Sequence, residues 1–320
     1  MKNLLIIILT SLMTFNALAQ STSYPDRQIR IISPFATGGI ADTFSRVVAQ
    51  GLNESWGQPA IVENKTGGGG NIGSDFVAKA PPDGYTLVMG NIGSHAVNPY
   101  LIKNMPYDPL KNFQPVAFVL DAEGLLVVNP SVPSKTVNEL IAYIKANPGK
   151  ISYGSGGVGT TSHLAGELFK FLAKVDMTHI PYKGNSPAIL DLISGQTQIM
   201  FATMPTVLPF VKTGKLRAIA VIGGSRTSAL PDLPTVSQTL PGFEVSNWIG
   251  IFAPTGTPTP IITKLNTEIN KIMQLPNNQK RLDAEGAKFR AMTPETFGMF
   301  QRDEAQKWAK IIKDSGIKPE

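Results

Sequence analysis

The stretch Ile151-Ser152-Tyr153-Gly154-Ser155-Gly156-Gly157-Val158-Gly159-Thr160-Thr161-Ser162-His163-Leu164 joins a short strand-like run to a glycine-rich turn and then to an amphipathic pattern. This order predicts a strand, a tight turn and a helix that begins near Thr160. The first backbone N–H groups of a helix have no partner within the helix and carry a partial positive charge. The stretch therefore predicts an anion-binding site at the start of this helix.

The same turn also satisfies a nucleotide-binding pattern. Gly154, Gly156 and Gly159 match G-x-G-x-x-G, and a second copy is formed by Gly68, Gly70 and Gly73. Neither copy opens the chain, the strand before the first copy is short, and the chain has no G-x-x-x-x-G-K-[ST] motif. A carboxylate or phosphate ligand is therefore favoured, and a nucleotide cofactor stays open as an alternative.

Strand, glycine turn and helix alternate along most of the chain. We expect strands at residues 28–33, 60–63, 85–89, 115–120, 124–128, 178–181, 198–202 and 216–222, and helices at residues 40–56, 137–146, 160–174, 186–193, 206–212, 258–273, 277–285 and 294–315. Alternation of this kind favours α/β sheets with helical crossovers. The order around residues 29–63 recurs around residues 151–181, which predicts two similar halves whose glycine turns face a shared cleft.

The chain is predicted to cross between these halves at two places in the sequence. The runs 115–120 and 124–128 follow each other without a helix, and the run 243–252 would return the chain. The predicted first domain therefore takes residues 20–123 and 247–320, and the second takes residues 124–246. The predicted fold is two-domain α/β, with mixed, mostly parallel sheets and two crossing strands as a hinge.

Composition places the protein among exported globular proteins. The 320 residues are 42% hydrophobic and 16% charged, and the net charge of +6 includes no basic run, which argues against nucleic-acid binding. Residues 1–19 have the basic start, apolar centre and Ala17-Leu18-Ala19 site of a secretory signal peptide, and the apolar run is too short to span a membrane. We expect a soluble periplasmic protein after cleavage.

Several kinds of chemistry are disfavoured by the residue types. The chain has no cysteine, and its three histidines, His95, His163 and His179, are scattered and include no H-E-x-x-H pair. There is no G-x-S-x-G elbow, and the adjacent Ser94 and His95 do not make a triad. We expect no metal, no cofactor and no catalytic residue, with an exported enzyme acting on a small carboxylate as the alternative.

Four residues have both a structural and a functional interpretation. Asp42, in the first turn of its helix, suits helix capping but is also able to receive a ligand amino group. Lys183 is either solvated or attracts an acidic ligand, Phe35 either packs in the core or forms a pocket wall, and His163 is either structural or touches a ligand.

The chain resembles the extracytoplasmic solute receptors of tripartite tricarboxylate transporters, the Bug family. The matching segments run in order through nearly all of the mature chain: Pro34-Phe35 with Gly38-Gly39 and Asp42, residues 62–65, 69–73, 77–80, 82–87 and 107–111, Gly154 to His163, Pro181-Tyr182-Lys183-Gly184, and residues 230–236 and 241–244. One departure is Thr37, where the family usually has proline, which loosens this turn.

The resemblance implies a periplasmic-binding-protein fold that closes on its ligand like a flytrap. It also implies a carboxylate held by backbone groups and ordered waters, such as a di- or tricarboxylate, an amino acid or an aromatic acid. The implied partners are membrane transport subunits or a sensor, and the protein is expected to be a monomer. Carried over, the implied ligand-binding residues are Phe35, Gly38, Gly39, Asp42, Asn91, Ser94 and His95 in the first domain and Ser155, Gly159, Thr160, Thr161, His163, Tyr182, Lys183, Ala202 and Thr203 in the second.

Overall fold

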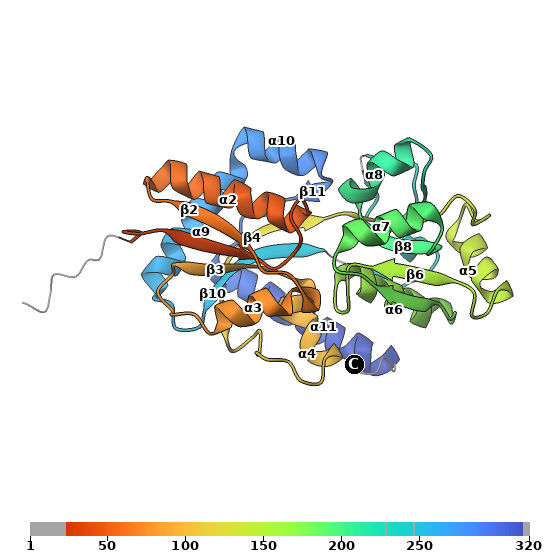
Figure 1. Ribbon diagram of the computed structural model, residues 1–320, viewed down its shortest axis with the longest axis horizontal. Helices are drawn as coiled ribbons and strands as arrows, with labels where there is room; N and C mark the ends of the chain where they lie inside the picture. The colour runs from red at the N-terminus through yellow and green to blue at the C-terminus, as the bar shows by residue number, and fades with distance from the viewer. Residues whose placement is uncertain (1–23, 228, 246, 316–320) are drawn as a thin grey trace, which may run out of the picture.

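The structure is a computed structural model that describes residues 24–315, apart from residues 228 and 246. These residues form two α/β units placed end to end along the long axis of the molecule (Figure 1). The predicted signal peptide, residues 1–19, lies outside the described residues. No helix in the described part of the chain combines the length and hydropathy that crossing a membrane requires.

The first sheet has six strands in the order β11-β4-β10-β3-β1-β2. Their bounds are β1 (Ile29–Ser33), β2 (Ala60–Asn64), β3 (Thr86–Asn91), β4 (Phe113–Ala122), β10 (Trp248–Pro254) and β11 (Ala287–Lys288). Successive side chains of a strand point to opposite faces. Leu87 and Met89 of β3 accordingly join one buried cluster, and Val88 between them joins another.

Helices cover both faces of this sheet. The α2 (Ile40–Trp56) and α9 (Thr259–Gln274) helices pack on the face of Leu87, and α3 (Asn71–Ala78) and α11 (Pro294–Ser315) pack on the face of Val88. Shorter pieces complete the unit: a 3₁₀ turn at Gly68–Gly70, a π-helical turn at Gly93–Val97, α4 (Asn98–Leu101) and α10 (Pro276–Ala284).

The second sheet has five strands in the order β7-β6-β8-β5-β9. Their bounds are β5 (Gly124–Val128), β6 (Ser152–Ser155), β7 (Thr178–Pro181), β8 (Ile199–Thr203) and β9 (Arg217–Val221). The α5 (Val137–Ala146) and α6 (Thr161–Ala173) helices pack on one face, and α7 (Asn185–Ser194) and α8 (Met204–Lys212) pack on the other. The predicted α/β class with two mixed sheets is therefore confirmed.

The parallel share of both sheets is smaller than expected. β1 is parallel to β2 and β3, and β6 is parallel to β7 and β8. The strands near the crossings, β4, β5 and β10, run antiparallel to their described neighbours. A chain that leaves the first unit through one strand and returns through its neighbour passes in opposite directions, which explains the antiparallel pair of β4 and β10.

Two segments connect the units and lie side by side (Figure 1). β4 leads through Glu123 into β5, and the chain returns into β10. The two segments are tied by backbone bonds, because the N–H of Ala122 donates to the carbonyl of Asn247 at 3.2 Å. The domain limits at residues 123/124 and 246/247 stay a prediction.

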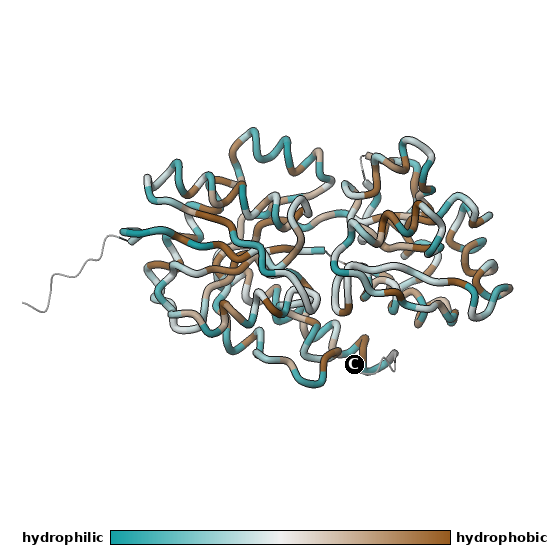
Figure 2. Tube along the Cα trace, in the orientation of Figure 1, coloured by the Kyte–Doolittle hydropathy of each residue, from teal (hydrophilic) through white to brown (hydrophobic). Residues whose placement is uncertain are grey.

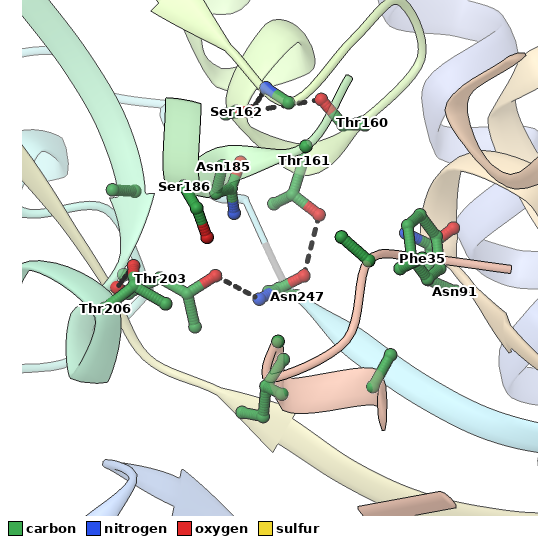
Figure 3. Close-up of a pocket in the computed structure, with 18 of the residues that line it drawn as sticks. Phe35, Asn91, Thr160, Thr161, Ser162, Asn185, Ser186, Thr203, Thr206 and Asn247 are labelled. Carbon is green, nitrogen blue, oxygen red and sulfur yellow. Dashed lines mark hydrogen bonds between the residues drawn. The ribbon is translucent and has the colours of Figure 1, made fainter. Parts of the chain in front are cut away.

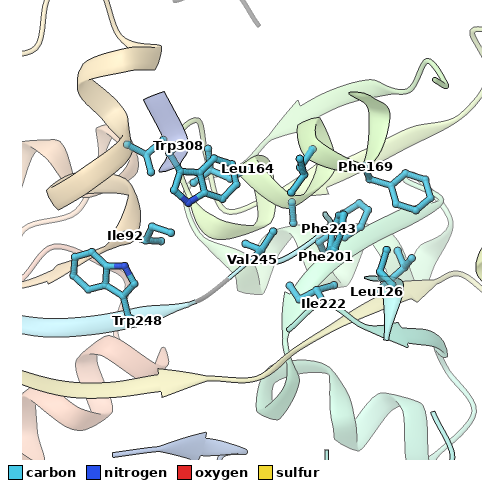
Figure 4. Packing of buried hydrophobic residues seen from close by; sticks show 14 of the residues in the cluster. Ile92, Leu126, Leu164, Phe169, Phe201, Ile222, Phe243, Val245, Trp248 and Trp308 are labelled. Atoms are coloured by element: carbon cyan, nitrogen blue, oxygen red, sulfur yellow. The ribbon is translucent and has the colours of Figure 1, made fainter. Parts of the chain in front are cut away.

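The hydrophobic core is continuous between the units. Figure 4 shows Trp308 of α11 beside Leu164 of α6, and both belong to the cluster that includes Phe201 and Trp248. The trace in Figure 2 has brown, hydrophobic stretches in the interior of each unit, whereas α10 on the outside is largely teal. α11 therefore packs mainly on the first unit, and its later turns reach the second.

Sequence periodicity placed most elements within a few residues of their bounds, and three features differ. The return strand begins at Trp248 rather than at residue 243. Pro241 and Gly242 lie in a turn there, and the N–H of Phe243 bonds back to the carbonyl of Leu240. β11 and the helical turns at residues 93–101 were not predicted from the sequence, because they are too short to show a period.

Candidate functional site

A small cavity lies between the two units, at the ends of the strands that lead into the glycine turns (Figure 3). Its volume is about 120 Å³. Pockets that hold drug-sized ligands occupy about 300–1,000 Å³, so this cavity suits a small molecule. Residues of both sheets and of both connecting segments contribute to its wall.

The N-termini of four helices meet at this cavity. Its wall includes the start of α2 at Gly39 and Ile40, the start of α6 at Thr161 and Ser162, the start of α7 at Asn185 and Ser186, and the start of α8 at Thr203 and Thr206. Each start carries N–H groups without a partner in its own helix and the positive end of a helix dipole. The four starts together create a positive potential without any positive side chain.

The side chains that line the cavity are all uncharged. The polar ones are Asn91, Thr160, Thr161, Ser162, Asn185, Ser186, Thr203, Thr206 and Asn247. The others are glycine, alanine, isoleucine or phenylalanine. An anion fits this wall because backbone N–H, hydroxyl and amide groups all donate hydrogen bonds to it. A ligand ammonium would find no carboxylate among these lining side chains.

Asn91 presents its amide nitrogen to the cavity. Its Oδ1 accepts hydrogen bonds from the backbone N–H of Ser94 at 3.0 Å and from Ser94 Oγ at 3.1 Å. Because a backbone N–H only donates, the atom that faces Ser94 must be the oxygen. The Nδ2 atom has no acceptor among the described residues and Asn91 is 7% exposed, so Nδ2 is available to a ligand.

Ser94 and His95 stand behind Asn91 rather than in the wall. Ser94 Oγ lies 2.9 Å from His95 Nδ1, and the His95 ring stacks on Phe252 with 4.1 Å between ring centroids. Complete burial lowers the pKa of His95 to about 3, so this ring is neutral at ordinary pH. The structure therefore places both predicted residues in support of Asn91, because β3 continues into a π-helical turn that directs them inward.

Asn247, which was not among the residues predicted from the sequence, connects three parts of the site. Its Oδ1 accepts from Thr161 Oγ1 at 2.7 Å, and its Nδ2 donates to Thr203 Oγ1 at 3.1 Å (Figure 3). Its backbone N–H donates to Asp121 Oδ1 at 3.0 Å. A lone amide within the apolar run of the return segment was the available signal for this residue.

Asp42 lies outside the wall, and its hydrogen bonds are satisfied within the protein. Its carboxylate accepts from the N–H of Gly38 at 3.0 Å, from Arg46 at 2.9 and 3.1 Å and from Asn64 at 2.9 Å. Burial by itself would raise the pKa of Asp42, but the bonds from Arg46, Gly38 and Asn64 outweigh it and lower that pKa. Asn64 also donates to the carbonyl of Phe35 at 3.0 Å, so Asp42 and Asn64 order the turn that carries Phe35.

Ser155 and His163 likewise lie behind the second glycine turn. The N–H of Gly159 donates to His163 Nδ1 at 3.2 Å, and Ser155 Oγ lies 2.6 Å from His179 Nε2. The two histidine rings are 4.4 Å apart. Burial, with help from Lys170, lowers the pKa of His163 to about 4, and burial, followed by His163, lowers the pKa of His179 to about 4.

Of the sixteen predicted ligand-binding residues, the cavity wall contains Phe35, Gly38, Gly39, Asn91, Thr160, Thr161, Ala202 and Thr203. The structure places the others outside it: Asp42, Ser94, His95, Ser155, Gly159, His163, Tyr182 and Lys183. Tyr182 and Lys183 line a neighbouring hollow, and Tyr182 donates to Asp191 at 2.7 Å. The Cα of Gly159 turns toward Asn98 of the first unit, where an added β-carbon would overlap the Asn98 amide oxygen.

The wall also contains residues that were not selected from the sequence: Ala36, Ile40, Ala41, Gly124, Gly156, Ser162, Gly184, Asn185, Ser186, Phe201, Thr206, Ile222, Asn247 and Ile249. The starts of α7 and α8 had been placed near residues 186 and 206, so these helix starts were a usable signal. The apolar residues of the wall carried no such signal, because nothing in the local sequence distinguishes an apolar residue in the wall from one in the core. No group of three or more His, Asp or Glu among the described residues is arranged to hold a metal ion.

Comparison with known proteins identifies the relatives of this chain. The profile of the tripartite tricarboxylate transporter family receptor matches residues 44–317. Protein BugT of Bordetella pertussis is 37% identical over 298 residues, which cover 92% of this chain and 91% of BugT. These similarities confirm the resemblance inferred from the sequence.

Two solved structures are similar over nearly the whole chain. Rpa4515 of R. palustris, solved with adipate, has 36% identity and a TM-score of 0.88, covering 93% of this chain and 100% of that one. MatC from Rhodopseudomonas palustris, solved with bound malate, has 32% identity and a TM-score of 0.85, covering 90% and 100%. Both relatives hold small dicarboxylates, and the matching family is one of receptors rather than enzymes.

Proposed function

The chain belongs to the tripartite tricarboxylate transporter receptor family, and we propose that it captures a small carboxylate in the cavity between its two units. The observation that carries this proposal is the meeting of four helix N-termini at a cavity whose lining side chains are all uncharged. A carboxylate there accepts hydrogen bonds from backbone N–H groups and side-chain hydroxyls. The lack of a lining cation means that the backbone supplies the charge complementarity.

The ligand is a di- or tricarboxylate or an aromatic acid rather than an amino acid. Adipate and malate, held by the two relatives, each carry two carboxylates and no ammonium. Asp42, an acid close to the wall, already accepts bonds from Gly38, Arg46 and Asn64, and Asp121 accepts the backbone N–H of Asn247. A ligand ammonium would leave water without gaining a carboxylate partner, which disfavours amino acids.

Ligand binding closes the two domains around the ligand. We assign the first domain to residues 20–123 and 247–320 and the second to residues 124–246, because the two tied segments are where the chain passes between the sheets. Hinge closure around a ligand uses connecting segments of this kind. The cavity draws on both domains, so an open form would lose half of its wall.

The biological role is delivery in the periplasm. The signal peptide at residues 1–19 sends the chain across the inner membrane, and the closed monomer presents its ligand to membrane transport subunits or to a sensor. The protein does not turn its ligand over: the histidines near the site are buried and neutral, and the lining side chains include no acid, base or activated nucleophile.

Mass spectrometry of ligand released by denaturing the purified protein tests this function. The expected result is a small carboxylate, with unchanged mass after prolonged incubation with the protein. Thermal shift with adipate, malate, aromatic acids, amino acids and nucleotides is the second measurement, since a ligand that binds the folded state raises the melting temperature, and the rise grows with the logarithm of the ligand concentration relative to its Kd. A shift with nucleotides alone would refute the receptor assignment, and conversion of an added acid would restore the enzyme alternative.

A further inference from the structure

A second hollow lies directly beside the cavity. Its volume is about 350 Å³, and it lies between the Gly67–Gly70 turn of the first unit and the Gly156–Val158 turn of the second. Three residues, Phe35, Gly156 and Gly184, line both spaces. The boundary between the two spaces is therefore one aromatic side chain from the first unit facing two glycines from the second.

The Phe35 ring is the part of this boundary that is able to move. Its backbone is held by the bond from Asn64 to its carbonyl at 3.0 Å. The side chain is only partly buried, and none of the aromatic pairs among the described residues includes it. Its Cζ lies against Gly70, where an added β-carbon would approach to 2.9 Å. The ring is thus set in place by contact with Gly70 and by one-sided packing against the hydrophobic cluster of the first unit rather than by stacking.

The hollow has the chemistry to accept the far end of a longer acid. Its wall contains the apolar side chains of Ile102 and Val158, and Lys183 is the one charged residue among those that line it. Lys183 is exposed and its ammonium has no acceptor among the described residues. An aliphatic chain entering past Phe35 would contact the apolar part, and a terminal carboxylate would reach the neighbourhood of Lys183.

We propose that Phe35 is the residue that limits ligand length, by closing the cavity off from the hollow next to Lys183. This inference rests on the proposed function, because it concerns the same carboxylate ligand. The cavity alone accommodates a short acid, and the ring excludes a longer chain. Replacing the ring by a small side chain joins the two spaces and moves the preference toward longer diacids.

The experiment compares wild type and Phe35→Ala by calorimetry with unbranched dicarboxylates from succinate through adipate to sebacate. The ratio of the Kd for sebacate to the Kd for succinate is expected to fall by about tenfold or more in the variant, since single methylenes in a fitted pocket already discriminate by about 10–200-fold. Phe35→Leu, which keeps most of the volume, is expected to give an intermediate ratio. Adding Lys183→Ala to Phe35→Ala is expected to weaken sebacate and leave succinate unchanged.

Phe76→Ala is the matched control, because this partly exposed ring of α3 lines neither space. This control is expected to leave the dependence of Kd on dicarboxylate length unaltered. A uniform loss of affinity for all diacids in Phe35→Ala and Phe35→Leu would show that the ring only packs the wall and would overturn the inference. An unchanged dependence of Kd on dicarboxylate length in Phe35→Ala would also overturn the inference. Failure of the wild type to bind any carboxylate would refute the proposed function as well.

Discussion

Gly93 of the first unit and Gly159 of the second approach so closely that a β-carbon on Gly93 would overlap the carbonyl oxygen of Gly159. A similar overlap occurs between a β-carbon on Gly69 and the carbonyl oxygen of Val158. Gly93 lies in the π-helical turn after β3, and its φ is not in the left-handed region. Its lack of a side chain is therefore required by the partner unit and not by its own backbone.

This relationship predicts that Gly93→Ala hinders closure while leaving both units folded. The added methyl meets Gly159 only when the units are together, so ligand affinity is expected to fall by about tenfold or more, in line with about 1–3 kcal/mol for overpacking. Small-angle scattering checks it: the wild type contracts on adding ligand, and the variant stays extended. Gly298→Ala, within α11 and with only ordinary neighbours, is the control. Contraction of Gly93→Ala to the wild-type size would contradict the prediction.

Asn247→Asp is expected to abolish carboxylate binding. The new carboxylate accepts from Thr161 and Thr203 where the amide accepted from one and donated to the other, so the Thr203 proton turns away from the ligand. It also brings negative charge to an anion site, and together these effects are of the order of several kcal/mol. Calorimetry with adipate or malate measures the loss.

The control for this change is Asn129→Asp. Asn129 is a buried amide outside the cavity, where it donates to the carbonyls of Leu192 and Ile193. Its substitution is expected to lower the melting temperature with no effect on Kd measured below that temperature. Equal affinity losses in both variants would mean that Asn247 acts only through overall stability.

Asp42→Asn is expected to make stability less dependent on pH below about 4. The pKa of Asp42 is lowered by folding, so its contribution is present above the ordinary pKa of about 3.9 and is lost as pH falls through the folded value. Urea unfolding at pH 7 should show the wild type more stable by about 1–3 kcal/mol, the range for a hydrogen-bonded buried charge. The difference should shrink in acid, and a constant difference at every pH would contradict the assignment.

Ligand affinity is expected to be flat between about pH 5.5 and 8 for acids that are fully ionised in that range. Burial lowers the pKa of His95 to about 3 and the pKa values of His163 and His179 to about 4, so these rings stay neutral. A titration in Kd near the ordinary histidine pKa of about 6.5 would show instead that one ring becomes charged beside the ligand.

Protein stability, unlike affinity, should fall as pH drops from about 6.5 toward 4. In that window the unfolded chain binds protons at the histidines and the folded chain does not, so acid favours unfolding. His179→Gln retains a partner for Ser155 and removes one of these groups, and its slope of unfolding free energy against pH is expected to be smaller than that of the wild type.

Most of the fold was predictable because its signals are local. α5 was placed at its observed bounds, and the strands around the glycine turns were placed within a few residues. Period and turn chemistry operate over a handful of neighbouring residues, so one sequence suffices to detect them. β11 and the helical turns at residues 93–101 are shorter than any detectable period.

The site was only half predictable for a related reason. The turns that reach the cleft were correctly located, but within each turn the sequence does not say which side chain points into the cavity and which points behind it. Ser94 and Asn91 are both polar and three residues apart, and only their mutual hydrogen bonds decide that the Asn91 amide faces the cavity. Asn247 was missed because its partners, Thr161 and Thr203, lie far away in the chain.

The sequence by itself determined two facing α/β halves, glycine turns at their strand ends and helix starts suited to an anion. Only the tertiary structure decided that four of those helix starts share one cavity, that Asp42 is satisfied by Arg46 and Asn64, and that Gly93 is required by Gly159. The physical reason is the distance along the chain over which each effect acts. Backbone propensity and helix dipoles act over neighbouring residues, whereas the direction of a side chain at a domain interface depends on atoms that the chain brings together only when both halves are folded and closed.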